Sequence, residues 1–220
     1  MHVAVNAAMS VDGKLASRER EQLAISGPED FDRVDRLRAE TDAIMVGVGT
    51  VLADDPSLTV DDTSANSAAG SGAQSTNPVR IVADSRARTP PDAQVLDDAA
   101  ETVVLVSEAV PTEHVTTLSS VGAEILEAGT NRVDLPAAFQ QLESMGIDDL
   151  LVEGGGELIY SLFEADLVDE LTVYVGSLVI GGRDAPTLAD GTGFTESYPE
   201  LTLRAVEELG DGVLLEYDVD

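Results

Sequence analysis

The sequence predicts an α/β fold, in which one domain is built on a mixed, mainly parallel sheet with flanking helices and an antiparallel C-terminal hairpin. Short apolar runs of strand type alternate with helical patterns over most of the 220 residues, as in chains whose parallel strands are joined by helices. Two further runs flank Gly210-Asp-Gly212 near the end of the chain, which is typical of a hairpin. Hydrophobic residues make up 43% of the chain, enough for one sizeable core.

The first part of the chain is expected to alternate strand and helix twice. Residues 2–8 (HVAVNAA) form a short apolar strand. A helix begins around Pro28, because proline is favoured in the first helical turn. Its apolar face is predicted to carry Phe31, Val34 and Leu37. Residues 43–48 (AIMVGV) predict a buried strand, a short helical segment follows from Gly49, and residues 58–60 (LTV) predict another short strand.

Residues 61–77 (DDTSANSAAGSGAQSTN) are polar and of low complexity. This composition predicts a mobile surface insertion. It does not predict a linker between domains, because the same alternation of elements continues after it. One domain over residues 1–220 is therefore expected.

The rest of the chain continues the pattern. Strands are predicted at residues 80–84, 102–107, 124–126, 149–153, 170–175, 201–208 and 213–219. A weak helix is expected at residues 111–118. The next helix is indicated by an apolar stripe made of Leu135, Ala138, Phe139, Leu142 and Met145. A third helix over residues 157–164 is expected to point Leu158, Leu162 and Phe163 inward.

The charge balance excludes several classes of partner. Asp and Glu total 42 and Lys and Arg total 12, which gives a formal net charge of −30. Nucleic acids and anionic membrane surfaces both require a basic face, so neither is expected as a partner. No apolar run reaches the ~18 residues of a spanning helix, and the first residues lack the basic region of a secretion signal. A cytoplasmic protein is therefore expected.

The composition also indicates the cell's salt content. Lysine occurs once, at Lys14, against 11 arginines. We interpret this as a folded protein adapted to a high-salt cytosol, because at ~1 M salt a Debye length of about 3 Å screens carboxylate repulsion. Because the chain has no cysteine, disulfides, thiolate catalysis and Cys-ligated zinc are excluded. The two histidines are far apart in sequence, so no metal site is expected.

The strongest local signal for chemistry is LVEGGGELIYS at residues 151–161. Glycines let a phosphate approach the backbone, and the start of the following helix offers free N–H groups. A tight packing turn is the alternative interpretation. Glu153 ends the preceding strand, where a carboxylate could accept hydrogen bonds from a substrate's amino groups or could be one exposed charge among many.

Polar residues follow other strands in the same way. Ser85, Arg86 and Arg88 come after the run RIVAD, where two arginines and a hydroxyl could hold the 2′-phosphate of NADP or form a salt-bridged surface. Lys14, the one lysine of the chain, lies beside a glycine turn. It either has a function that arginine fills less well or is retained by chance. Asp54 precedes Asp55-Pro in VGVGTVLADDPSLTV, where an acid could equally cap the turn.

In this order the motifs NAAMSVDGK, ISGPED, LADDPSLTV, PVRIVADS and VEGGGELIYS resemble the riboflavin-biosynthesis reductase family. That family is the reductase part of the bifunctional deaminase-reductase, and it is a separate protein in archaea and fungi. The resemblance covers nearly the whole chain apart from residues 61–77. It implies a dihydrofolate-reductase-like fold, a homodimer and NADPH as cofactor. The implied reaction reduces 2,5-diamino-6-ribosylamino-4(3H)-pyrimidinone 5′-phosphate to the ribitylamino phosphate, with a hydride passing to sugar C1′.

The resemblance also assigns site residues. Along the dinucleotide it places Ala8, Ala24, Thr50, Asp54, Ser85, Gly155, Gly156, Glu157, Leu158, Ile159, Tyr160 and Ser161, to which the strand-end pattern adds Arg86. Along the substrate it places Gln22, Arg38, Leu58 and Glu153, with Lys14 as a further cation. Asp54 and Glu153 are the candidate proton donors, and water is an equal alternative.

Two features set this chain apart from the family pattern. Asp61 stands where the family often has an arginine that helps hold the substrate phosphate, which leaves Arg38 and Lys14 as the cations nearby in sequence. The zinc deaminase half is absent, so reduction without deamination is expected. Two other functions stay open: another dihydrofolate- or pterin-type reductase on this fold, and a non-catalytic nucleotide-binding protein.

Overall fold

The computed structural model describes residues 1–21, 23–60 and 77–220. Gln22, Asp61 and the rest of the predicted insertion up to residue 76 lie outside the described residues. The chain divides into two compact units. The first comprises residues 35–151 with Met1, and the second comprises residues 2–34 and 152–220. A single domain over residues 1–220 stays a prediction.

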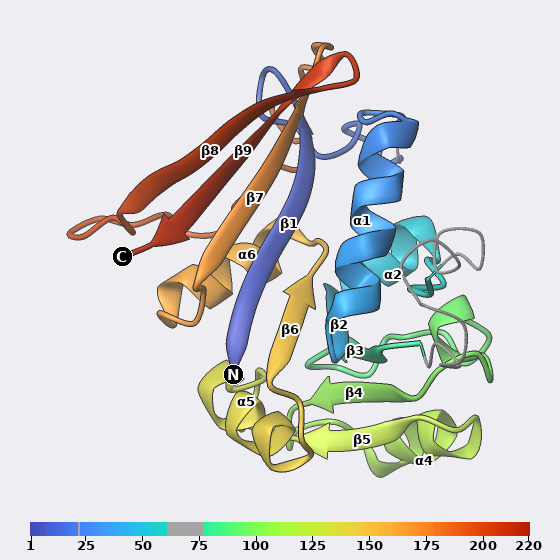
Figure 1. The fold of residues 1–220 in the computed structure, drawn as a ribbon. Coiled ribbons are helices and arrows are strands. Elements are labelled where there is room, and N and C mark those ends of the chain that lie inside the picture. Colours follow the sequence, from blue (N-terminus) through green and yellow to red (C-terminus); the bar gives the residue numbers. More distant parts are fainter. Residues whose placement is uncertain (22, 61–76) are drawn as a thin grey trace. The chain divides into compact units, whose positions relative to one another are not determined.

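The first unit is built on parallel strands in the order β5-β4-β3-β2 (Figure 1). These strands are β2 (Ala43–Gly47), β3 (Val79–Ala83), β4 (Thr102–Val106) and β5 (Glu124–Glu127). The unit also contains α2 (Val48–Asp54), the 3₁₀ turn η1 (Gln94–Leu96), α4 (Thr112–Ser120) and α5 (Leu135–Ser144), and β6 (Asp149–Val152) begins in it. β4 is buried along its whole length, which explains why it is a continuous apolar run.

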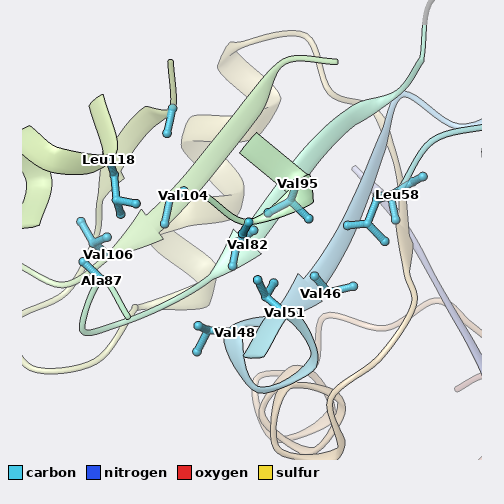
Figure 2. Packing of buried hydrophobic residues seen from close by; sticks show 13 residues of the cluster. Val46, Val48, Val51, Leu58, Val82, Ala87, Val95, Val104, Val106 and Leu118 are labelled. Carbon is cyan, nitrogen blue, oxygen red and sulfur yellow. The ribbon is translucent and has the colours of Figure 1, made fainter. Parts of the chain in front are cut away.

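Valines in register hold this unit together. Val46, Val82 and Val104 lie opposite one another on three neighbouring strands and are all 0% exposed. Figure 2 shows them in one cluster with Val51 of α2 and with Leu58. The core therefore fixes both the helix after β2 and the chain that follows it.

The second unit contains the antiparallel part of the fold. Its strands are β1 (His2–Ser10), β7 (Glu170–Gly176), β8 (Leu201–Leu209) and β9 (Gly212–Val219), in the order β1-β7-β9-β8. β1 and β7 are parallel, whereas β9 runs antiparallel to both β7 and β8. Helix α6 (Gly156–Glu164) belongs to this unit and α1 (Pro28–Glu40) begins in it. The predicted α/β class, with mainly parallel strands and a C-terminal hairpin, is confirmed.

Two local predictions are wrong. Residues 58–60 form no strand, because Leu58 has a φ of +52°, a left-handed conformation that a strand does not contain. Phe31 of α1 is 58% exposed instead of facing inward. The buried residue of that helix is Asp30, which accepts hydrogen bonds from Arg33.

Within the described residues, no helix has both the length and the apolar character needed to cross a membrane. The same residues contain no group of three or more His, Cys, Asp or Glu that could hold a metal ion.

Candidate active site

The glycine turn opens α6 without a side-chain cap. Gly154 and Gly155 have φ values of +147° and +96°, which residues with a side chain rarely adopt. Gly155 is the N-cap residue, and no side chain of the described residues caps the helix there. The first turn of an α-helix has N–H groups without intrahelical partners, and an anion is favoured at that end. This end of α6 can therefore receive a phosphate through its backbone.

Gly156 serves packing. A Cβ built on it would overlap the Thr187 carbonyl oxygen and lie 2.8 Å from Asp190 Oδ2. The Asp190 N–H donates to the Gly156 carbonyl at 2.9 Å, and the Asp190 carboxylate accepts from the Thr187 N–H at 3.2 Å. The packing interpretation therefore holds for Gly156, and a phosphate site at the helix start stays a prediction.

Three consecutive side chains of α6 face the protein. Leu158, Ile159 and Tyr160 are at most 7% exposed, so their side chains are core and only their backbone groups are available. Glu157, in the first turn, is exposed. The Tyr160 hydroxyl donates to Glu164 at 3.1 Å. Ser161 donates to the Glu157 carbonyl at 2.8 Å, within its own helix.

Lys14 is attached to the segment that packs on α6. Its Nζ donates to the Ala185 carbonyl at 3.1 Å, and its backbone forms an isolated bridge with Thr187. Lys14 therefore helps to hold residues 185–187 in position. Elsewhere in the second unit, Ala8 lies near the carboxyl end of β1 and is half-buried, and Ala24 is exposed ahead of α1.

In the first unit, Ser85 comes just after the carboxyl end of β3. Its Oγ accepts from the Val133 N–H at 2.9 Å, and its carbonyl accepts from Ser107 Oγ at 2.8 Å. The hydroxyl hydrogen of Ser85 remains able to donate. Thr50 lies in the first turn of α2. Gly47 and Ala83, the last residues of β2 and β3, are paired, so Thr50 and Ser85 follow neighbouring strand ends.

Arg86 lies in a turn that a buried acid shapes. Asp84 is 0% exposed and accepts from the Thr89 N–H at 2.7 Å and from the Thr89 hydroxyl at 2.8 Å. Arg86 is exposed, and among the described residues its guanidinium has no hydrogen-bond or ion-pair partner. The turn therefore exposes the Arg86 guanidinium, which no other described residue binds. Asp84 was not among the predicted site residues, although an acid ending an apolar strand five residues before Thr89 is a visible signal for such a turn.

Asp54 and Asp55 differ in role although they are neighbours. Asp54 is the last residue of α2, and partial burial of its carboxyl raises its pKa above the ordinary value. Asp55 caps that helix in a left-handed conformation, and its Oδ1 accepts from the Gln94 N–H at 2.8 Å. The capping interpretation therefore holds for Asp55.

The segment after α2 is held close to Arg38. The Arg38 Nη1 donates to the Thr59 carbonyl at 3.0 Å. The side chain of Leu58 is 2% exposed in the core of Figure 2, so only its backbone is free to meet a ligand. Glu153, the remaining predicted substrate residue, directly follows β6 and is half-buried.

The chain resembles known proteins over almost its whole length. Residues 1–215 match the family described as the RibD C-terminal domain. The 2,5-diamino-6-ribosylamino-4(3H)-pyrimidinone 5′-phosphate reductase of Methanothermobacter thermautotrophicus is 48% identical over 220 residues, covering 99% of this chain and 98% of the relative. The reductase of the same name from Archaeoglobus fulgidus is 46% identical over 211 residues, covering 96% and 94%.

Solved structures show the same fold. A pyrimidine reductase-like protein from Corynebacterium diphtheriae superposes with a TM-score of 0.85 at 17% identity, covering 100% of this chain and 92% of that one. A deaminase/reductase from Thermotoga maritima superposes with a TM-score of 0.78 at 22% identity, covering 100% of this chain and 56% of that one. Because the family match spans residues 1–215 and the relatives are aligned nearly end to end, this chain belongs to the RibD C-terminal domain family.

Proposed function

We propose that this chain reduces 2,5-diamino-6-ribosylamino-4(3H)-pyrimidinone 5′-phosphate to the ribitylamino phosphate, with NADPH as the reductant. Its relatives at 46% and 48% identity carry the name of that reductase. The observation that carries the proposal is the uncapped start of α6 behind two glycines of positive φ. This is a backbone phosphate site at the motif that the sequence singles out.

Each unit, taken by itself, carries donor groups of a type that suits one part of a nicotinamide dinucleotide phosphate. In the second unit, the α6 amides suit a pyrophosphate, because Gly155 has no Cβ to obstruct it. In the first unit, Arg86 is an exposed cation and Ser85 keeps a hydroxyl hydrogen to donate, which suits a 2′-phosphate. NADPH, when bound, supplies the hydride that reduces sugar C1′.

The groups proposed for the substrate are of a different type. Glu153 offers carboxylate oxygens to the amino groups of the pyrimidine. Arg38 and Lys14 supply positive charge, although both already bind backbone carbonyls. Leu58 contributes its backbone, and Gln22 completes the set from outside the described residues. Asp54 is the better candidate proton donor, because burial raises its pKa and so retains its proton to a higher pH than an ordinary aspartate would.

The test is NADPH oxidation followed by absorbance with the ribosylamino-pyrimidinone phosphate, in ~2–3 M KCl as the charge screening requires. Dihydrofolate serves as the competing substrate. We expect turnover of the pyrimidine only. Turnover of dihydrofolate alone would establish the pterin-type alternative, and NADPH binding without any turnover would establish a non-catalytic protein.

We further propose a cytoplasmic homodimer. Two exposed apolar side chains of the edge strand β8 support a self-association surface, since Leu203 and Val206 are 53% and 59% exposed. Sedimentation at several protein concentrations measures the state, and a monomer at all of them contradicts it.

A further inference from the structure

A buried arginine ties several segments of the first unit together. The Arg80 side chain, on β3, is 0% exposed, although arginine is rarely fully buried. Its Nε donates to Thr102 Oγ1 at 3.0 Å, and its ion pair with Asp97 measures 2.8 Å. Its remaining bonds go to backbone carbonyls, those of Ser57, Gln94, Asp97 and Ala100. A buried charge persists where every donor has such a partner.

Two of these bonds lead to residues 54–60, the segment after α2. The Arg80 Nη1 donates to the Ser57 carbonyl at 3.3 Å and to the Gln94 carbonyl at 3.2 Å. Gln94 in turn bonds Asp55, through its N–H to Oδ1 at 2.8 Å and through Nε2 to the carbonyl at 2.7 Å. Arg80 therefore holds residues 55–57 both directly and through Gln94.

The held segment has an unfavourable backbone. Asp55 and Leu58 have φ values of +42° and +52°, and residues with a side chain are disfavoured in this left-handed region. Such conformations persist only where the surroundings determine them. In this unit the surroundings are the Leu58 side chain in the core, Arg38 on Thr59, and the Arg80–Gln94 bonds.

We propose that Arg80 is a positioning residue for ligand binding, which keeps residues 54–60 in the conformation that meets cofactor and substrate. The proposal rests on the proposed function, because that function gives Asp54 and Leu58 their ligands. Arg80 itself touches neither ligand. Loosening the segment lowers the fraction of protein that is competent to bind, and the apparent dissociation constant rises in inverse proportion to that fraction. KM should therefore change and kcat should not, because the bound segment is ordered in either case.

The test is Arg80→Lys, which keeps the charge but replaces a planar five-donor group with a compact ammonium. We expect KM for the pyrimidine phosphate to rise ~10-fold, as when the competent fraction falls to about a tenth, with kcat within about twofold. Amide hydrogen exchange at residues 54–60 of the free protein should accelerate, because the open form of the segment becomes more populated. An unchanged KM, or unchanged exchange there, overturns the proposal.

Two further variants separate positioning from stability. Asp97→Ala removes the ion pair, whose carboxylate side is 52% exposed, but leaves the bond to Ser57. It should lower the melting temperature and leave KM unchanged. Gln94→Ala removes the side-chain bond to Asp55 at an exposed position, so it carries the test even if Arg80→Lys does not fold. Gln94→Ala should raise KM. In the double variant with Arg80→Lys, the combined effect on KM should be less than the sum of the two single effects, expressed as free energies. Additive effects, or a KM shift in Asp97→Ala equal to that in Arg80→Lys, contradict the proposal.

Failure of the proposed function has a separate signature. Wild-type protein that does not oxidise NADPH refutes the reductase activity. The exchange rates of residues 54–60 in wild type, Arg80→Lys and Gln94→Ala still decide whether Arg80 holds the segment.

Discussion

Arg86 and Arg88 leave the same turn but differ in what they contact. The Nε of Arg88 lies 3.9 Å from Asp84 Oδ1 on a side chain that is 54% exposed, a weak ion pair. The Arg86 guanidinium has no partner within the described parts of the chain. The sequence offers both arginines for a 2′-phosphate, and the structure favours Arg86 because its donors are free.

Arg86→Ala should therefore weaken NADPH binding much more than NADH binding. Losing one charge-assisted contact costs about 1.5–3 kcal/mol, or roughly 10- to 150-fold in the dissociation constant. Fluorescence titration with both cofactors measures the ratio. Arg88→Ala is the matched comparison from the same turn and should change the ratio little. Equal losses for NADPH and NADH would show that Arg86 does not bind the 2′-phosphate.

Glu153→Gln tests the substrate assignment. The variant keeps the shape but replaces one acceptor oxygen with a donor, so a substrate donor would face another donor. A buried polar group left unpaired costs about 1–3 kcal/mol, so kcat/KM should fall by roughly one to two decades. NADPH affinity, measured in the same titration, should change little. Wild-type kinetics would remove Glu153 from the site, and lost NADPH binding would assign it to the cofactor.

Single residues also show the limits of sequence reasoning. Lys14 stands out in a chain with one lysine, yet what it binds, the Ala185 carbonyl, depends on a contact 171 residues away. The structural role of Arg80 could not be predicted from the sequence, because a charged residue in an apolar run normally points to solvent. Its burial depends on carbonyls from the chain at Ser57 and around η1, whose course no local pattern predicts.

Elements made of continuous apolar residues were predictable and those held by polar contacts were not. β3 and β4 lie within one residue of the predicted ranges, because their side chains are largely buried. The strand prediction at residues 58–60 is wrong because the apolar side chain of Leu58 is buried in the core from a backbone of left-handed conformation, which a strand does not contain. Residues 177–200 contain no helix or strand of more than bridge length. They are held partly by Asp12, Lys14 and Asp190.

The start of α6 should be sensitive to one methyl group. Gly156→Ala places a Cβ against the Thr187 carbonyl and Asp190, and overpacking of this kind costs about 1–3 kcal/mol. Gly13→Ala is the comparison, since its φ is +78° and, apart from residues 12–14 themselves, no described atom lies within 4 Å of the added Cβ. It carries backbone strain alone, of about 1–2 kcal/mol. Urea unfolding measures the free energy of unfolding of both variants. Equal losses would show that the start of α6 shifts to accommodate the methyl group at Gly156. Gly155→Val is less informative, because a φ of +96° strains any branched residue.

The turn at residues 10–14 should give the protein an acid-sensitive contact. Asp12 accepts from the Ser10 hydroxyl at 2.6 Å and from the N–H groups of Ile180 and Gly181. These hydrogen bonds lower its pKa to about 2. A lowered folded-state pKa means that the contribution is present above the unfolded value of about 3.9 and is lost as the pH falls towards 2. The difference in unfolding free energy between wild type and Asp12→Asn should therefore shrink from pH 4 to pH 2. A constant difference would contradict this.

At the scale of the whole molecule, the net charge of −30 cannot be offset by ion pairs, since 42 carboxylates face 12 cations. Several of those cations are also committed to internal structure. Arg80 is buried on backbone carbonyls, and Arg33 binds Asp30 and Asn6. Like-charge repulsion therefore acts against the folded state wherever salt does not screen it.

Stability should accordingly follow ionic strength. The Debye length is about 10 Å at 0.1 M salt and about 3 Å at 1 M, so most of the screening is gained between these concentrations. We expect the melting temperature, followed by circular dichroism, to rise steeply from 0.1 M to 1 M KCl and then to level off. Potassium sulfate at matched ionic strength separates the causes, because sulfate also strengthens apolar burial through exclusion from the surface. If the melting temperatures in the two salts coincide at each ionic strength, screening is the cause. Higher melting temperatures in sulfate indicate that exclusion of the salt from the surface contributes. A melting temperature unchanged between 0.1 M and 3 M KCl contradicts adaptation to high salt.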